Sequence, residues 1–147
     1  MPSSHDFIKD KRNKNIKIFI NDKFYQRDKA QISVFDSGFL LGDGVWSGIR
    51  FHNNKFLFLK DHLDRLFDDA KKISLQIHLT KKEITKILLN TIKINKMKTD
   101  VHIRLVVSRG IKSTPYQDPA FTISKPTIVV IPEYKQPQTS VYKTGLV

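Results

Sequence analysis

The amino-acid sequence predicts an α+β fold, in which a mixed or antiparallel sheet packs against two amphipathic helices. Several short segments alternate apolar and polar residues and are separated by turn-forming residues, which is typical of strands. Two longer segments in the middle of the chain repeat apolar residues at helical spacing. A length of 147 residues, of which 39% are hydrophobic, is enough for one domain with a buried core.

The chain begins with a polar, lysine-rich segment. We expect residues 1–14 to form a flexible basic arm, because they lack the apolar residues that would anchor them to a core. A small hairpin follows, with strands over residues 16–20 and 23–26 and a turn at Asn21-Asp22.

A second hairpin is predicted after a glycine-rich loop. Three glycines interrupt residues 36–44, so this segment is expected to contain at most one short helical turn. Residues 45–52 are predicted to be a strand, and residues 55–59 the returning strand. Asn53-Asn54 between them suits a tight turn with positive φ.

Two helices are predicted next. The second begins at a capping box, Thr80 followed by Glu83, and is expected to run to about Lys96. The apolar stripe of the first helix consists of Leu63, Leu66, Phe67, Ala70 and Ile73.

The last part of the chain returns to strands. Residues 101–108 alternate cleanly, which puts His102 and Arg104 on the face opposite four apolar side chains. Residues 127–131 form a β-branched run, predicted to be a buried central strand. We expect residues 134–147 to be a linker and the first strand of a second domain, which leaves residues 15–133 as the main domain.

Composition excludes several functional classes. The net charge is +12, but Lys far outnumbers Arg and is spread along the chain, so we expect no nucleic-acid partner. No apolar run is long enough for a membrane span and the first residues do not resemble a signal peptide, which favours a cytoplasmic protein with no membrane partner. Cys is absent and the five His residues are scattered, so no metal site is predicted.

One continuous segment carries a family resemblance. From Val34 to Leu66 the chain reads VFDSGFLLGDGVWSGIRFHNNKFLFLKDHLDRL. This resembles the opening segment of the fold-type IV, or class IV, aminotransferases, which use pyridoxal 5'-phosphate (PLP) as cofactor. The family includes branched-chain and D-amino-acid transaminases and aminodeoxychorismate lyases. The resemblance covers about residues 16–147 and implies the smaller N-terminal domain of a two-domain enzyme.

The resemblance makes Arg65 a candidate cofactor-binding residue. In the family, the Arg of an H-L-x-R-L helix binds the PLP phosphate, and this chain reads HLDRL from His62 to Leu66. A planar, permanently charged fork suits a phosphate dianion. The helical pattern alone favours a solvated surface Arg that pairs with Asp61 or Asp69.

Two further residues are candidates for the substrate pocket. The family's V-F-E-G-I-R strand corresponds to VWSGIR, from Val45 to Arg50, which puts Trp46 at the pocket-lining aromatic position and Ser47 where Glu is common. Arg104 matches the Arg of a Y-I-R motif that lies near the active-site side in the family. The alternatives are a core or interface Trp and an Arg on a simple exposed strand face.

The loop after the strand over residues 101–108 bears on specificity. The SRG that ends at Gly110 matches the family's T/S-R-G, where Arg109 is expected to hold the following loop. D-amino-acid transaminases place an Arg and a His shortly after this motif, where this chain has Thr114 and Tyr116. Both are pocket candidates, and Lys112 is a possible weaker contact for an anion.

The resemblance also implies the activity. The family's Schiff-base Lys belongs to its second domain and is expected beyond Val147, so no catalytic residue is assigned and this chain alone is predicted to be inactive. The expected substrates are amino acids, branched-chain in preference, and 2-oxo acids, and the full-length protein is expected to be a homodimer. The alternatives are an aminodeoxychorismate-lyase-type enzyme and a non-catalytic interaction module derived from the domain.

Overall fold

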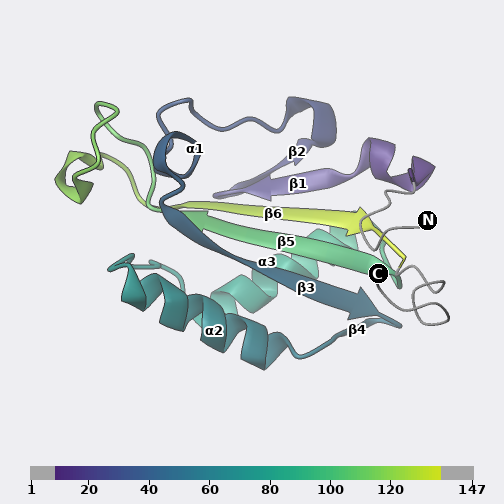
Figure 1. Ribbon diagram of the computed structural model, residues 1–147. Coiled ribbons are helices and arrows are strands. Elements are labelled where there is room, and N and C mark those ends of the chain that lie inside the picture. The colour runs from purple at the N-terminus through teal and green to yellow at the C-terminus, as the bar shows by residue number, and fades with distance from the viewer. Residues whose placement is uncertain (1–8, 137–147) are drawn as a thin grey trace, which may run out of the picture.

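The computed structural model of the chain describes residues 9–136, which form one sheet with its two long helices on the same face (Figure 1). The sheet has six strands in the order β2-β1-β6-β5-β3-β4, and each pairing is antiparallel. The predicted α+β fold is confirmed. The strands are β1 (Lys17–Ile20), β2 (Lys23–Gln26), β3 (Gly44–His52), β4 (Lys55–Phe56), β5 (Val101–Ser108) and β6 (Thr127–Tyr134). The helices are α1 (Ser37–Leu41), α2 (Leu59–Lys72) and α3 (Lys81–Ile94), with 3-10 turns η1 (Lys11–Asn15), η2 (Arg27–Lys29) and η3 (Pro119–Phe121).

The middle strands β3, β5 and β6 carry the hydrophobic core on their helix-facing side. β5 has the predicted bounds, and its four core-facing side chains are 0% exposed: Val101, Ile103, Leu105 and Val107. β6 lies between β1 and β5, so the predicted central position of this β-branched strand is confirmed. The alternating apolar residues of the sequence therefore face the helices, and the residues between them face the other side of the sheet.

The two long helices close the core from one side. α2 packs on β3, and α3 packs on β1 and β6. The buried face of α2 consists of Leu63, Leu66 and Ala70, three members of the predicted stripe. The capping box of α3 is confirmed, because Thr80 and Glu83 each bond the backbone N–H of the other.

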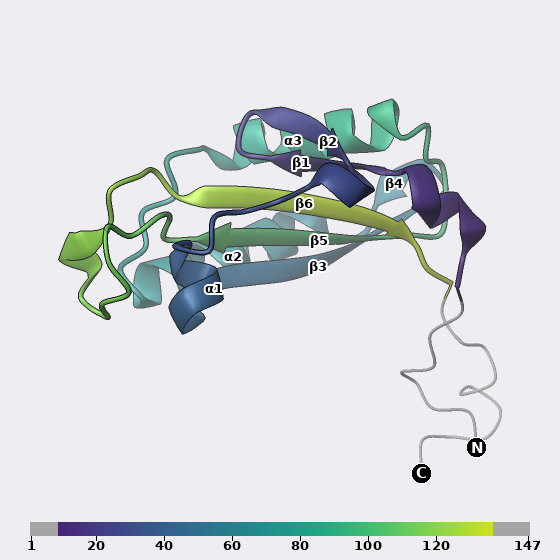
Figure 2. The same ribbon diagram turned by 90° about the horizontal axis from the view of Figure 1, so that it is seen from above.

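The opposite face of the sheet is only partly covered. Figure 2 looks onto this face, where the segment from η2 to α1 crosses in front of the sheet and the long helices lie behind it. α1 is the predicted single helical turn. Its N-cap Asp36 accepts a hydrogen bond from the Gly38 N–H at 2.9 Å, and Gly42 ends it at φ 68°, a left-handed conformation that glycine adopts without strain.

Both predicted hairpins are present, with one correction. The turn residues Asn53 and Asn54 have φ of 47° and 60°, as expected. The returning strand predicted over residues 55–59 is shorter, because β4 contains only Lys55 and Phe56. The chain then turns at Phe58, whose φ of 51° marks the N-cap of α2, so Leu59 is helical.

The structure adds detail at the two ends of the expected domain, whose division from a second domain stays a prediction. β6 continues past residue 133 to Tyr134, and it passes through Pro132 because β1 pairs with β6 only at Val129 and Val130. The arm predicted over residues 1–14 is not free throughout, since η1 begins at Lys11. The strand expected after the linker and most of that arm lie outside the described residues.

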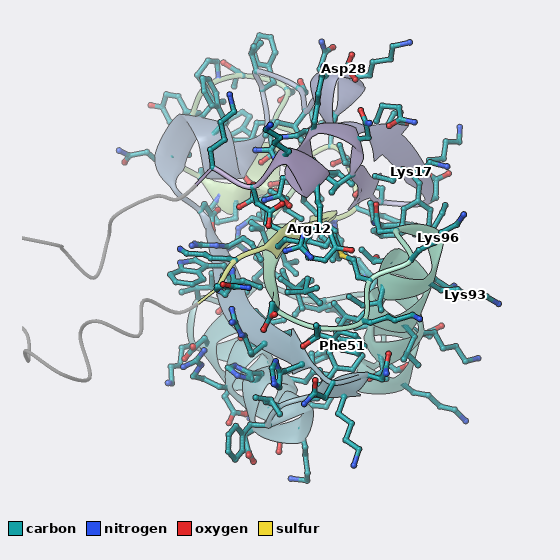
Figure 3. All side chains as sticks on the ribbon, turned by 90° about the vertical axis from the view of Figure 1, so that its right-hand side faces the viewer. Arg12, Lys17, Asp28, Phe51, Lys93 and Lys96 are labelled. Carbon is teal, nitrogen blue, oxygen red and sulfur yellow. The ribbon has the colours of Figure 1, made fainter. Side chains whose placement is uncertain are left out.

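η1 is held to the end of β6 by the side chain of Asn13, which is only 8% exposed. Its amide donates to the carbonyl of Tyr134 at 2.9 Å and accepts from the Tyr134 N–H at 2.8 Å. Arg12 also covers the Tyr134 ring, 3.8 Å from its centre, and Figure 3 shows Arg12 in the middle of this end of the molecule. The Asn13 amide thus pairs with β6 as a neighbouring strand would.

Replacing Asn13 should therefore destabilise the domain. Asn13→Ala leaves both backbone groups of Tyr134 unpaired and is expected to lower the free energy of unfolding by about 1–3 kcal/mol. Urea unfolding monitored by circular dichroism measures the change, with Lys14→Ala as the exposed neighbouring control. Equal stability of the two variants would contradict the assigned role of Asn13.

Candidate active site

The partly covered face of the sheet carries a cationic and aromatic cluster. Trp46 projects from β3 with 57% of its surface exposed, and the Arg104 guanidinium lies 4.0 Å from the centre of a Trp46 ring. Strand register explains the contact, because Gly48 lies opposite Arg104 and the long Arg side chain reaches diagonally to Trp46. This cation–π contact brings together two of the residues that the sequence predicts for the substrate pocket.

The neighbouring row of the same face adds Arg50 from β3, His102 from β5 and Glu133 from β6, which lie opposite one another across the three strands. The His102 ring lies against Gly48: a Cβ at that glycine would be 2.9 Å from the His102 Nε2 atom. Gly48 therefore leaves the space that the imidazole occupies.

Positive charge dominates the surroundings of His102. Burial lowers the pKa of this imidazole, and the nearby charges of Lys135, Arg104 and Arg50 lower it further, whereas Glu133 acts in the opposite direction. A surface with this excess of cations attracts small anions such as carboxylates.

An apolar groove lies next to this cluster, between α1 and the sheet. It has a volume of about 370 Å³. Its apolar walls include Ile32, Phe39, Trp46, Val106 and Val129. The exposed Trp46 therefore borders both a cationic surface and a hydrophobic groove.

On the helix side of β3, Arg65 projects from α2. Its Nη2 atom donates to the Ser47 hydroxyl oxygen at 3.3 Å, and the same oxygen lies 3.0 Å from the Nδ1 atom of His62. Within residues 9–136, no ion pair includes Arg65, so the alternative pairs with Asp61 or Asp69 are not formed. Arg65 is an exposed residue, and the one hydrogen bond of its side chain among the described residues is to the neutral Ser47.

Arg65 and the pair of Trp46 and Arg104 face opposite sides of the sheet. Trp46 and Ser47 are consecutive residues of β3, so their side chains point in opposite directions. β4 pairs with β3 only at Phe51 and His52, and no other described strand lies along that edge. A ligand that contacts both groups must therefore pass around the edge of β3.

Arg109 ties three segments together at the end of β5. Its guanidinium makes a bidentate ion pair with Asp43, at 2.6 and 3.0 Å, just before β3. It also donates to the carbonyls of Ile73 and Ser74, at 2.8 and 2.9 Å, where α2 ends. Arg109 is structural, as predicted, but its side chain holds the start of β3 and the end of α2 instead of the loop after Gly110.

The loop after Gly110 does not join this cluster. Tyr116 is 63% exposed and its ring packs at a tilt of 60° against Phe121, with ring centres 5.4 Å apart. No hydrogen bond or ring contact among the described residues links Tyr116 or Thr114 to Trp46 or Arg104. The anion contact suggested for Lys112 was wrong: this side chain is 1% exposed and its Nζ donates to the Asp118 carbonyl at 2.9 Å, inside the loop.

Several features were not apparent from the sequence. The contacts of Ser47 with His62 and Arg65 join residues 15 and 18 positions apart, which no local pattern indicates. Strand alternation does place His102 beside Arg104, but the addition of Arg50 requires the register between β3 and β5. In the described part of the chain no group of three or more His, Cys, Asp or Glu is arranged to hold a metal ion, and no helix is long and apolar enough to cross a membrane.

Comparison with known proteins gives a consistent result. Residues 44–147 match the family model for amino-transferase class IV. A putative branched-chain-amino-acid aminotransferase of Methanocaldococcus jannaschii is 44% identical over 116 residues, which cover 79% of this chain and 39% of that protein. A D-alanine aminotransferase of Listeria monocytogenes is 33% identical over 98 residues, which cover 67% of this chain and 34% of that protein.

A solved structure matches the fold. It is the branched-chain amino acid aminotransferase of T.th., complexed with N-(5'-phosphopyridoxyl)-L-glutamate, and it gives a TM-score of 0.72 at 21% identity. The match covers 84% of this chain and 41% of that one. The chain thus spans about two fifths of the length of this protein and of the Methanocaldococcus relative.

The Arg109 tie is expected to be the strongest single polar contact near the candidate site. Arg109→Ala leaves the largely buried Asp43 carboxylate without its partner and should lower the free energy of unfolding by about 3–5 kcal/mol. Lys72→Ala, which removes an exposed ion pair with Asp69, should cost no more than about 1 kcal/mol. Urea unfolding of both variants tests this difference. If Arg109→Ala lowers the free energy of unfolding as little as Lys72→Ala does, the contacts of Arg109 are not important for stability.

Proposed function

The chain belongs to the class IV aminotransferase family, and from this premise we propose that it contributes to a PLP-dependent transaminase that acts on amino acids. Arg65 carries the proposal. Its exposed guanidinium is fixed beside β3 by a single neutral partner, Ser47, and forms no ion pair within the described residues. Such a cation fits the phosphate of PLP, because a fixed fork with free N–H groups makes charge-assisted hydrogen bonds to a dianion.

PLP, when bound, supplies an electron sink for amino-group chemistry. The residues described here bind and orient. Arg65 would hold the phosphate, and Trp46 and Arg104 would form one wall of the substrate site, where the Arg104 guanidinium faces an anionic group of the amino acid. The excess of cations around His102 suits the carboxylate of an amino-acid substrate, and the apolar groove beside Trp46 suits its side chain.

We propose a branched-chain L-amino acid as the amino donor and a 2-oxo acid as the acceptor. The apolar walls of the groove suit an aliphatic side chain. A branched-chain assignment is also the name given to the relative that is 44% identical. Thr114 and Tyr116 stay proposed pocket residues. Because their loop does not contact Trp46 or Arg104 of the same chain, they would line the pocket of the other subunit in a homodimer. The exposed apolar side chains of Val34, Phe39 and Leu41 support such a covered surface.

Removal of the Arg65 charge tests the cofactor role. The protein is expressed from its complete natural reading frame and titrated with pyridoxamine phosphate, which lacks the aldehyde that reacts with surface Lys, and with pyridoxamine, which lacks the phosphate. Arg65→Ala should weaken pyridoxamine phosphate binding by about tenfold to a hundredfold, because hydrogen bonds to a charged group are lost, and leave pyridoxamine unaffected. Lys71→Ala, an exposed cation of the same helix, is the control. Unchanged phosphate preference in Arg65→Ala would remove Arg65 from the site.

The reaction class has its own test. The protein from the complete reading frame should transfer the amino group of leucine or valine only when a 2-oxo acid acceptor is present, whereas the 147-residue chain alone should not, since the residues described here are proposed only to bind and orient. Turnover without an acceptor would favour a lyase, and faster turnover of D-alanine than of leucine would contradict the branched-chain assignment. If the protein from the complete reading frame neither binds pyridoxamine phosphate nor converts any of these amino acids, the non-catalytic interaction module would be favoured.

A further inference from the structure

Ser47 is a buried polar residue in an apolar setting. It lies on the helix-facing side of β3, opposite Leu105 of β5, and is 0% exposed. A hydroxyl buried in this way is costly unless it is hydrogen-bonded. Its oxygen has two partners, Arg65 and His62, both from α2. Both hydrogen bonds of this buried hydroxyl therefore connect β3 to α2.

The direction of these hydrogen bonds depends on the tautomer of His62. Burial lowers the pKa of this imidazole and the nearby Arg65 charge lowers it further, whereas Asp61 acts in the opposite direction, so the neutral ring is favoured at pH 7. Arg65 has only N–H donors and therefore donates to the Ser47 oxygen. Because Ser47 is buried, its O–H is paired only if it donates to the Nδ1 atom of His62, which corresponds to the tautomer with the imidazole proton on Nε2.

We propose that Ser47 is the positioning residue of Arg65, and that His62 fixes the rotation of the Ser47 hydroxyl. The inference rests on the proposed role of Arg65 in binding the PLP phosphate. Arg65 donates to Ser47, and Ser47 donates to His62, so each donor in this hydrogen-bond chain meets an acceptor. The guanidinium therefore has a preferred orientation before any ligand binds. Less side-chain freedom is then lost on binding.

The chemistry of a hydroxyl is important for this role. A carboxylate at position 47, where Glu is common in the family, would orient Arg65 through an ion pair, whereas Ser47 orients it through a neutral hydroxyl. Ser47 directs the guanidinium and leaves its full positive charge for an anion at the exposed end. The assigned role thus predicts an effect on phosphate preference rather than on pyridoxamine binding as a whole.

Ser47→Ala in the protein from the complete reading frame tests the inference. The preference for pyridoxamine phosphate over pyridoxamine should fall about threefold to tenfold, less than in Arg65→Ala, and Ser47→Ala should have no further effect when Arg65 is already Ala. Thr91→Val, which alters a buried hydroxyl of α3 bonded within its own helix, is the control and should keep the preference. Ser47→Cys fills the same space with a weaker hydrogen-bonding group and replaces Ser47→Ala if that variant does not fold.

A second readout does not depend on any ligand. Nitrogen NMR of the wild-type chain should show His62 with its proton on Nε2 and an unprotonated Nδ1 that accepts a hydrogen bond, and Ser47→Ala or Ser47→Cys should shift the Nδ1 signal. If Arg65→Ala loses the phosphate preference but Ser47→Ala and Ser47→Cys retain it, the inference is wrong and the proposed function stands. If Arg65→Ala retains the preference, the proposed phosphate site itself is wrong. A proton on His62 Nδ1 in the wild type would also overturn the inference.

Discussion

The alternation of side chains along β3 is the constraint on which the rest of the candidate site depends. Within three consecutive residues, this strand turns Trp46 and Gly48 toward the partly covered face and Ser47 toward α2. The eight-residue ladder with β5 fixes which side each residue faces, since a slip of one residue would exchange the two sets. The hydrophobic core enforces that register, because Ile49 shares the face of Ser47 and is 0% exposed. One strand therefore presents Ser47, which contacts the proposed phosphate ligand Arg65, and Trp46, a proposed pocket residue, next to each other in sequence.

The ion pair between Arg109 and Asp43 secures the start of this strand. Asp43 immediately precedes β3, while Arg109 immediately follows its partner β5, so the pair closes the end of the ladder. The same guanidinium holds the carbonyls of Ile73 and Ser74, which directly follow α2, the helix that carries Arg65. Placement of Arg65 relative to Ser47 is thus determined at two points, by the ladder of β3 and by the anchored end of α2. The positions of these side chains are built into the fold rather than left to a loop.

Features that depend on residues close in the sequence were predictable, whereas features that depend on contacts between distant residues were not. The bounds of β5 and the capping box of α3 depend on nearby residues, and both were predicted correctly. β4 was predicted too long because Phe58 adopts a left-handed conformation that its residue type does not indicate. The part of the arm near Lys11 was predicted free because its anchor, Asn13, bonds Tyr134, which is 121 positions away. Resemblance located Arg65 and Trp46, but the partner of Arg65 depended on the packing of α2 against β3.

Positive charge is present on both sides of β3. On the helix side, Arg65 is oriented by a neutral hydroxyl and faces a neutral imidazole, so its charge is not cancelled locally. On the other side, Arg50, Arg104 and Lys135 surround His102, with Glu133 as the opposing carboxylate. Both surfaces favour anions, and the edge of β3 separates them. The neutral Ser47 hydroxyl and the lowered pKa of His62 keep the positive charge of Arg65 available on the helix side, because neither partner carries an opposing charge.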